Sequence, residues 1–147
     1  MDNEIWKDIP GYEGLYQISN LGRIKSLPRE RNNQYSNKEL ILKQTDDGRG
    51  YLQVILNNNG KRKGFKVHKL VAQIFLDKKI FKSMPNENKD EINLDKLEVN
   101  HIMEFEKNNN SVDNLEWCTR LYNCNYGTRN MRVDSWKNGN RKRKDNK

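Results

Sequence analysis

The fold of this chain is decided by the stretch LEVNHIMEFEKNNNSVDNLEWCTRLYNCNYG at residues 97–127. Its pattern predicts a strand from Leu97 to His101 and a returning strand from Leu115 to Cys118. The Asn-rich segment 107–114 between them has no periodicity and is predicted to form a turn region. Thr119 is a suitable helix N-cap and Gly127 a suitable helix stop, so one or two helical turns should follow. The predicted order is strand, loop, strand and short helix.

A short amphipathic helix is predicted upstream of this stretch. In HKLVAQIFL, residues 68–76, one helical face collects four apolar side chains: Leu70, Val71, Ile74 and Phe75. Residues 77–96 are mostly polar and contain Pro85. They are therefore predicted to be a linker or insertion that joins the helix to the first strand.

Two β-hairpins are predicted in the N-terminal part of the chain. Apolar and polar residues alternate from Tyr16 to Ser26, and a Ser-Asn-Leu-Gly segment supplies the reversal. A second alternating run, from Tyr51 to Val67, contains the strong turn signal Asn59-Gly60. Residues 28–39 lack periodicity and are predicted to be a loop, followed by a short apolar run at 40–42.

The composition favours a polyanionic partner. The 147 residues include 28 Lys plus Arg against 20 Asp plus Glu, which gives a net charge of +8 and a pI of about 9.5. Nucleic acid is therefore the leading candidate, and an acidic small substrate is disfavoured. Only 33% of the residues are hydrophobic, which limits the chain to one compact unit with appended pieces.

The sequence predicts a soluble protein of the cytoplasm with no membrane partner. No signal peptide is visible, and no apolar run reaches the roughly 18 residues typical of a membrane span. Two cysteines are too few for a disulfide scaffold and fit a reducing compartment. The tail, residues 131–147, ends in RKRKDNK and is predicted to be basic and disordered.

His101 and Asn123 are the first candidates for a catalytic site. His101 ends a predicted strand, and Asn123 lies on the short helix that follows the returning strand. Hard divalent cations such as Mg²⁺ prefer oxygen ligands, which carboxamides and DNA phosphates supply. An imidazole, with an ordinary pKa near 6.5, can take a proton from an attacking water. The pattern therefore indicates metal-dependent hydrolysis of phosphodiester bonds.

Four motifs occur in a characteristic order: VHKLVAQIF at 67–75, VNHI at 99–102, NNNSVDNLEWCT at 108–119 and YNCNYGTRN at 122–130. Together they closely resemble the HNH nuclease family, in particular its phage and intron homing-endonuclease branch with the ββα-metal fold. The segment from Trp6 to Leu27 resembles the nuclease-associated modular motif found N-terminal to these enzymes. The resemblance implies an α+β protein, with an N-terminal antiparallel β-hairpin module that binds DNA and then a small ββα-metal HNH nuclease domain.

The resemblance assigns a role to each polar residue of the motif. Asn100, the residue before the histidine, is implied to bind the metal, and His101 to act as the general base. Asn114, thirteen positions after His101, is implied to brace the loop and orient the histidine. Asn123, nine residues further on, is implied to be the second protein ligand, with Asn125 as the alternative. The implied cofactor is a divalent metal, Mg²⁺ before Mn²⁺.

Two features differ from the family pattern. The loop after His101 contains Met103-Glu104-Phe105-Glu106 where the family has a shorter polar turn, so it is one residue longer. Asn100 and Asn123 are both neutral, so the expected site offers the metal no protein carboxylate. Metal affinity is therefore expected to depend on the phosphate of the substrate.

Basic residues of both hairpins and of the helix are predicted to contact double-stranded DNA. The candidates are Arg23, Lys25, Lys61, Arg62, Lys63, Lys66 and Lys69. A solvated charged face is the alternative interpretation of such a run, but no acidic residue interrupts 61–69. The predicted organisation is a DNA-binding module at 1–66, a nuclease domain at 67–130 that contains 77–96 as an insertion, and the tail.

The remaining candidates are expected to be structural. His68 opens the predicted helix and is expected to cap it or to hydrogen-bond a strand. Cys118 and Cys124 could join the histidines at a zinc site, but they lack the paired spacing of zinc ligands and are expected to be small buried hydrophobes. Trp6 and Trp117 are expected to belong to the core.

The predicted function is metal-dependent cleavage of DNA that leaves 5′-phosphate and 3′-hydroxyl ends. Site-specific nicking of the homing type by a monomer or weak dimer is expected, with no small-molecule cofactor. Two alternatives stay open: a catalytically inactive DNA-binding protein derived from this family, and a zinc-stabilised structural or RNA-binding module.

Overall fold

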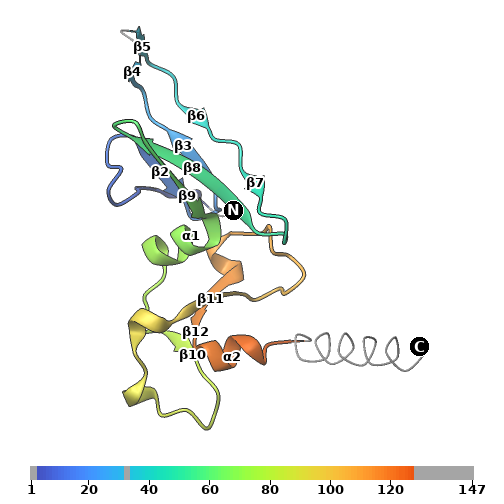
Figure 1. Cartoon of the computed structure of the whole chain (residues 1–147). Coiled ribbons are helices and arrows are strands. Elements are labelled where there is room, and N and C mark those ends of the chain that lie inside the picture. Colours follow the sequence, from blue (N-terminus) through green and yellow to red (C-terminus); the bar gives the residue numbers. More distant parts are fainter. Residues whose placement is uncertain (1–2, 32–33, 128–147) are drawn as a thin grey trace, which may run out of the picture.

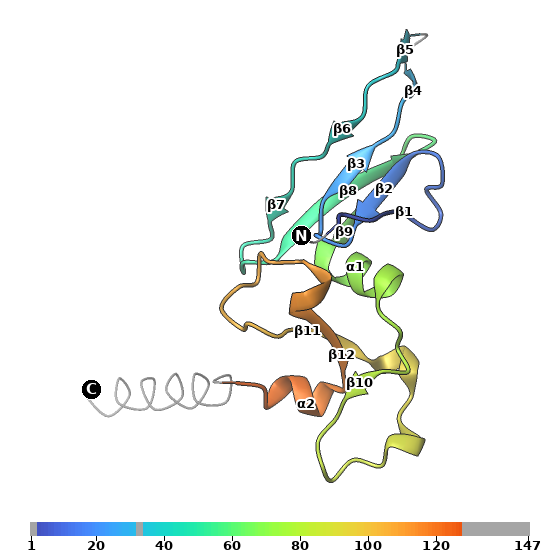
Figure 2. The same cartoon turned by 180° about the vertical axis from the view of Figure 1, so that it is seen from behind.

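The computed structural model describes residues 3–31 and 34–127. Figures 1 and 2 show a β-rich N-terminal half at one end, the helix α1 in the middle, and a small sheet with the helix α2 at the other end. Sheets dominate and the helices are short, in agreement with the predicted α+β class. The predicted disordered tail at 131–147 lies outside the described residues. Within the described ranges no helix has the length and apolar character that a membrane crossing requires.

The first sheet contains the predicted N-terminal hairpin. Its antiparallel strands follow the order β1 (Trp6–Asp8), β2 (Tyr16–Ser19), β3 (Ile24–Ser26) and β6 (Leu40–Ile41). Ile18 of β2 pairs with Ile24 of β3, and both are fully buried. The alternating pattern therefore predicts this hairpin correctly. The apolar run at 40–42 supplies an edge strand whose side chains Leu40 and Ile41 are exposed.

The interval between β3 and β6 is not the loop that was predicted for residues 28–39. It contains β4 (Arg29–Arg31) and β5 (Gln34–Ser36), which pair antiparallel. Figures 1 and 2 show this pair projecting from the body of the protein. Backbone hydrogen bonds hold such an arm together without an apolar face, so no hydrophobic alternation marks it in the sequence.

The second predicted hairpin is confirmed. Strand β8 (Leu52–Asn58) pairs with β9 (Lys61–Lys66), and β7 (Thr45–Asp46) adds a third strand. Asn59 and Gly60 form the turn with φ of 52° and 80°. Both angles lie in the left-handed region that a two-residue type I′ turn requires, which is why Asn-Gly is a reliable signal.

Helix α1 (Val67–Phe75) begins one residue before the predicted span and connects the two halves. The main hydrophobic core joins Ile18 and Leu56 of the N-terminal strands to Val71 of α1 and Leu115 of the C-terminal sheet. This core crosses the boundary expected between residues 66 and 67. The parts of the chain before and after this boundary therefore share buried surface.

The C-terminal sheet has the strand order β10 (Phe81–Lys82), β12 (Leu115–Cys118) and β11 (Glu98–His101). Strands β11 and β12 pair antiparallel, with His101 opposite Leu115. Helix α2 (Arg120–Cys124) follows directly, and Thr119 caps it by accepting a hydrogen bond from the Tyr122 N–H. The predicted order of strand, loop, strand and short helix is confirmed.

The segment 77–96 is more than the linker or insertion that its polar composition predicts. Strand β10 pairs parallel with β12 and completes the sheet. Two short 3-10 helices follow, Lys89–Glu91 and Leu94–Lys96. Phe81 and Ile92 pack against the small core cluster that contains Trp117. These apolar residues are irregularly spaced, so periodicity does not reveal their contacts.

Candidate active site

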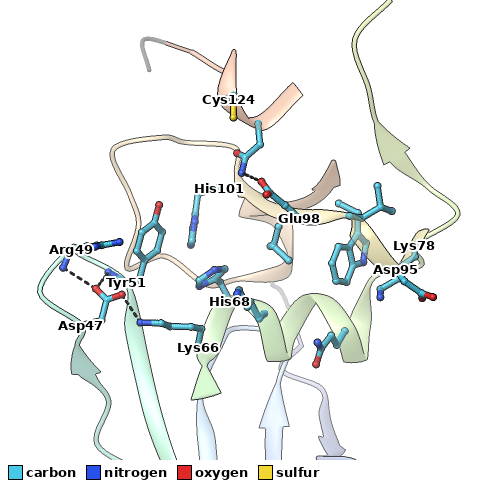
Figure 3. Close-up of a pocket in the computed structure, with 16 residues that line it drawn as sticks. Asp47, Arg49, Tyr51, Lys66, His68, Lys78, Asp95, Glu98, His101 and Cys124 are labelled. Carbon is cyan, nitrogen blue, oxygen red and sulfur yellow. Dashed lines mark hydrogen bonds and ion pairs between the residues drawn. The ribbon is translucent and has the colours of Figure 1, made fainter. Parts of the chain in front are cut away.

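A pocket of about 850 Å³ lies where the β7–β8 loop, α1, β11 and α2 meet (Figure 3). Its lining includes Arg49, Tyr51, His68, Lys69, Glu98, His101 and Asn123. His101 and Asn123, which the sequence proposes as partners, therefore open on the same space. Arg49 and Tyr51 come from the N-terminal half, and no sequence signal placed them at this site.

His101 ends strand β11 and is 3% exposed. Its Nε2 lies 2.8 Å from Asn110 Oδ1. Because an amide oxygen accepts hydrogen bonds and does not donate them, Nε2 carries the proton and Nδ1 is the nitrogen that can accept one. The resemblance gave the orientation of this histidine to Asn114, whereas the structure places the side chain of Asn110 at the ring.

Asn114 closes the loop that follows β11, at the end of the 3-10 helix η3 (Val112–Asn114). Its Oδ1 accepts from the Met103 N–H at 2.9 Å, and its Nδ2 donates to the Asn109 carbonyl at 2.9 Å. Its backbone carbonyl accepts from the Ile102 N–H at 2.8 Å. These bonds join the two ends of the loop, as bracing requires, and a part for Asn114 in catalysis stays a prediction.

The carboxamides of Asn100 and Asn123 both donate to carboxylates. Asn123 Nδ2 lies 2.7 Å from Glu98 Oε2, and Asn100 Nδ2 lies 2.9 Å from Glu116 Oε1. Asn123 lines the pocket together with Glu98, whereas Asn100 is 1% exposed and lies outside its lining. In each carboxamide the N–H is engaged by a carboxylate, so the carbonyl oxygen is the atom that suits a cation.

Glu98 and Glu116 are residues that the sequence analysis missed. Alternation along β11 places Glu98 and Asn100 on the same face of the strand. Glu116 of β12 lies directly opposite Asn100. Side chains two positions apart in a strand share a face, so the position of Asn100 could have identified Glu98 from the sequence. The expected site is thus not without carboxylates, and each of them contacts one of the two candidate ligands.

The donor set suits a hard cation better than zinc. In residues 3–31 and 34–127 there is no group of three or more His, Cys, Asp or Glu side chains that could hold a metal ion. Amide and carboxylate oxygens are the ligands that Mg²⁺ accepts, with water and phosphate completing its shell. Cys118 is buried as predicted, but Cys124, on the short helix α2, is exposed.

His68 is part of the site, contrary to the expectation that it only caps α1 or bonds a strand. Its ring centroid lies 5.1 Å from that of His101 and 5.2 Å from that of Tyr51 (Figure 3). No side chain caps α1, and His68 Nδ1 is buried without a hydrogen-bond partner. Burial, and then the neighbouring His101, lower the pKa of His68 to about 4. His68 is therefore neutral near pH 7.

The predicted DNA-binding residues fall into three places. Lys66 and Lys69 line the pocket, and Lys66 forms an ion pair with Asp47. The hydrogen bond from Lys66 is the main reason that the pKa of Asp47 falls to about 2. Three exposed residues, Lys61, Arg62 and Lys63, lie on β9 towards its turn.

Arg23 and Lys25 form the third place, around Trp6. Arg23 Nε donates to Glu4 Oε1 at 2.7 Å, and Lys25 Nζ lies 3.2 Å from Glu39 Oε2. Both cations also lie over the Trp6 ring. Trp6 is therefore a partly exposed platform rather than the core residue that was expected, whereas Trp117 is buried as predicted.

Comparison with known proteins gives one family match. Residues 4–57 match the NUMOD4 motif, which extends the N-terminal resemblance seen between Trp6 and Leu27. The matched residues include strands β1 to β7, most of β8, and the pocket residues Arg49 and Tyr51.

Two similar proteins carry endonuclease names. The DNA endonuclease I-HmuI of Bacillus phage SP01 is 36% identical over 118 residues, which are 80% of this chain and 54% of that protein. The uncharacterized HNH endonuclease L247 of Acanthamoeba polyphaga mimivirus is 35% identical over 133 residues, 87% of this chain and 27% of that protein. The chain thus spans about half or less of the length of these curated relatives.

A solved structure is similar across most of the chain. It is described as DNA binding and cleavage by the HNH homing endonuclease I-HmuI. The match has a TM-score of 0.57 and 30% sequence identity, and it covers 91% of this chain and 68% of that one.

Proposed function

The chain belongs to the HNH homing endonuclease family, and from this membership we propose that it is a metal-dependent DNA endonuclease with His101 as its general base. The observation that carries the proposal is the contact of His101 Nε2 with Asn110 at 2.8 Å inside a pocket that Asn123 also lines. That contact fixes Nδ1 as the basic nitrogen of the ring.

His101 performs the proton transfer in this proposal. Its Nδ1 accepts a proton from the water that attacks the scissile phosphorus, while Asn110 keeps the ring in the required tautomer. The neutral His68 beside it adds no positive charge that would oppose protonation of His101. The attacking water is proposed to reach His101 from the pocket that this residue lines.

Asn100 and Asn123 are proposed to hold the divalent metal through their carbonyl oxygens. When bound, Mg²⁺ or Mn²⁺ stabilises the negative charge that develops on the leaving 3′ oxygen. Glu98 and Glu116 accept the amide N–H groups and turn the carbonyl oxygens away from themselves. The products are a 5′-phosphate and a 3′-hydroxyl end.

Double-stranded DNA is the proposed substrate. Lys66, Lys69 and Arg49 line the pocket and can hold phosphates next to His101. The exposed residues Lys61 to Lys63 on β9 extend this basic surface away from the pocket. One His101 pocket acts on one strand at a time, so a monomer is proposed to nick DNA rather than to break both strands.

A nicking assay tests this proposal. The full chain is incubated with supercoiled plasmid in Mg²⁺ or in EDTA, and conversion to the open circular form is followed on a gel. Open circles that form with Mg²⁺ and not with EDTA support a metal-dependent nuclease. A protein that binds the plasmid but leaves it supercoiled in Mg²⁺ and in Mn²⁺ would instead be an inactive DNA-binding relative.

A further inference from the structure

The turn between β2 and β3 lies against the loop that carries Asn110. The backbone N–H of Val112 donates to the carbonyl of Asn20 at 2.8 Å, which ties that loop to the turn. The turn itself is held from within, because Ser19 Oγ accepts from the N–H groups of Leu21 and Arg23 at 3.2 and 3.1 Å. A rigid part of the NUMOD4 region therefore contacts the nuclease half.

Gly22 of this turn lies close to Asn110. Its φ is +84°, and a Cβ placed on it would lie 2.9 Å from Asn110 Cβ and 3.0 Å from the Asn110 carbonyl oxygen. Real Cβ atoms essentially never come as close as 2.9 Å, so a side chain at this position would force Asn110 to shift and would also strain the backbone. Asn110 is correspondingly 3% exposed.

Packing is what holds the Asn110 side chain. Its Oδ1 contacts His101 Nε2 at 2.8 Å, but its Nδ2 is buried with no hydrogen-bond partner. An amide held by a single hydrogen bond can rotate about its side-chain torsions unless its neighbours block the movement. Gly22 lies beside the Cβ and the backbone carbonyl of Asn110, so a side chain at residue 22 would displace the backbone from which the amide extends.

We propose that the β2–β3 turn is a working part of the nuclease site, in which Gly22 fixes Asn110 and Asn110 fixes the His101 ring. Gly22 and Asn110 are positioning residues, and this inference rests on the proposed role of His101 as the base. The N-terminal half then contributes to catalysis itself and not only to DNA binding. Its hydrophobic core, which is shared with α1 and Leu115, keeps the turn in place.

The test compares Gly22→Ala with Gly11→Ala. Gly11 has nearly the same φ, +85°, but nothing lies within 4 Å of a Cβ placed on it, so the pair separates contact from backbone strain. Asn110→Ala keeps the Cβ against Gly22 and removes only the amide. This variant tests the contact with His101 even if Gly22→Ala does not fold. The kcat and KM for plasmid nicking in Mg²⁺ are measured for each full-length variant, with the ¹⁵N NMR shifts of the His101 ring.

We expect Gly22→Ala and Asn110→Ala to lower kcat by about tenfold or more, a share of what a general base contributes. Their KM should change by less than about twofold, since DNA contacts are intact. Both should also lose the Nε2-protonated signature of His101, which Gly11→Ala should keep. A Gly22→Ala variant with the kcat and ring shifts of Gly11→Ala, or an Asn110→Ala variant with full kcat, would overturn the inference.

The ring shifts separate this inference from the proposed function. If the wild-type chain does not cleave DNA but both variants change the His101 tautomer, the positioning contact is real and the nuclease proposal fails. If the wild-type chain cleaves DNA and neither variant alters the ring or kcat, the nuclease proposal stands and the positioning contact is refuted.

Discussion

Asn123 Nδ2 and Glu98 Oε2 lie 2.7 Å apart on the wall of the pocket that also holds His101. A second contact of the same kind joins Asn100 to Glu116 across the β11–β12 pair. Groups that orient a metal ligand and raise its electron density strengthen metal binding without touching the metal. In the proposed metal site, the two carboxylates therefore offset the neutrality of the two carboxamides.

Replacing Glu98 by Gln should weaken metal binding. The substitution keeps an oxygen that can accept from Asn123 but removes the negative charge, so we expect the Mg²⁺ concentration for half-maximal nicking to rise by about 10- to 100-fold. Excess Mg²⁺ should restore the rate. Asp95→Asn is the control, because Asp95 is another carboxylate of the same pocket and comes from the 3-10 helix Leu94–Lys96 instead of β11. Equal Mg²⁺ requirements in the two variants would remove Glu98 from the metal site.

Asn123 and Asn125 are neighbours that should behave differently. Asn123 lines the pocket, whereas Asn125 is exposed and donates to the Leu121 carbonyl at 2.8 Å. We expect Asn123→Ala to lower both Mn²⁺ affinity, followed by electron paramagnetic resonance of the free ion, and the nicking rate. Asn125→Ala should change neither by more than about twofold. Similar losses at both positions would leave the choice of ligand on α2 unsupported.

Asn114 should matter for stability as much as for activity. Its buried side chain bonds the Met103 N–H and the Asn109 carbonyl, and Asn114→Ala leaves both groups without this partner. We expect a loss of about 1–3 kcal/mol in the free energy of unfolding, measured by urea titration. Asn108→Ala, at an exposed position of the same loop, should cost less than about 0.5 kcal/mol. An unchanged midpoint for Asn114→Ala would show that the loop does not need this brace.

The stability of the fold should fall in mild acid because of His68. The pKa of His68 is about 4 in the folded chain, below its ordinary value of 6.5, so the unfolded chain binds the extra proton first. Stability should therefore drop as the pH falls from about 6.5 to about 4. His101, Lys66 and Lys69 disfavour the charged form and Asp47 favours it. In His68→Leu, the urea midpoint of unfolding should depend less on pH over this range. If the midpoint of this variant falls as steeply as that of the wild-type chain, other groups cause the effect.

Alternation of apolar and polar residues, together with turn residues, predicted the elements that are formed by neighbouring segments of the chain. The hairpins at Tyr16 to Ser26 and Tyr51 to Val67, and the order of strand, loop, strand and helix, follow from alternation and turn residues. Strand β10 was missed because a two-residue parallel pairing leaves no periodic signal. The β4–β5 arm was missed because it has no apolar face.

Of the residues at the site, only those that belong to the sequence motifs could be predicted. His101 and Asn123 were found from their spacing, and the pocket does bring them together. Asn110 was missed because it is one of three consecutive asparagines, and only the folded loop distinguishes the one that meets His101. Arg49 comes from a distant part of the chain, and packing of the two halves brings it to the pocket.

The single measurement that tests the central claim most directly is the nicking rate of His101→Ala on supercoiled plasmid at saturating Mg²⁺, with DNA affinity measured alongside. If His101 takes the proton from the attacking water, the rate should fall by roughly 10²- to 10⁴-fold while the affinity for DNA stays nearly unchanged. A folded His101→Ala protein that binds DNA and nicks it at the wild-type rate would contradict the account.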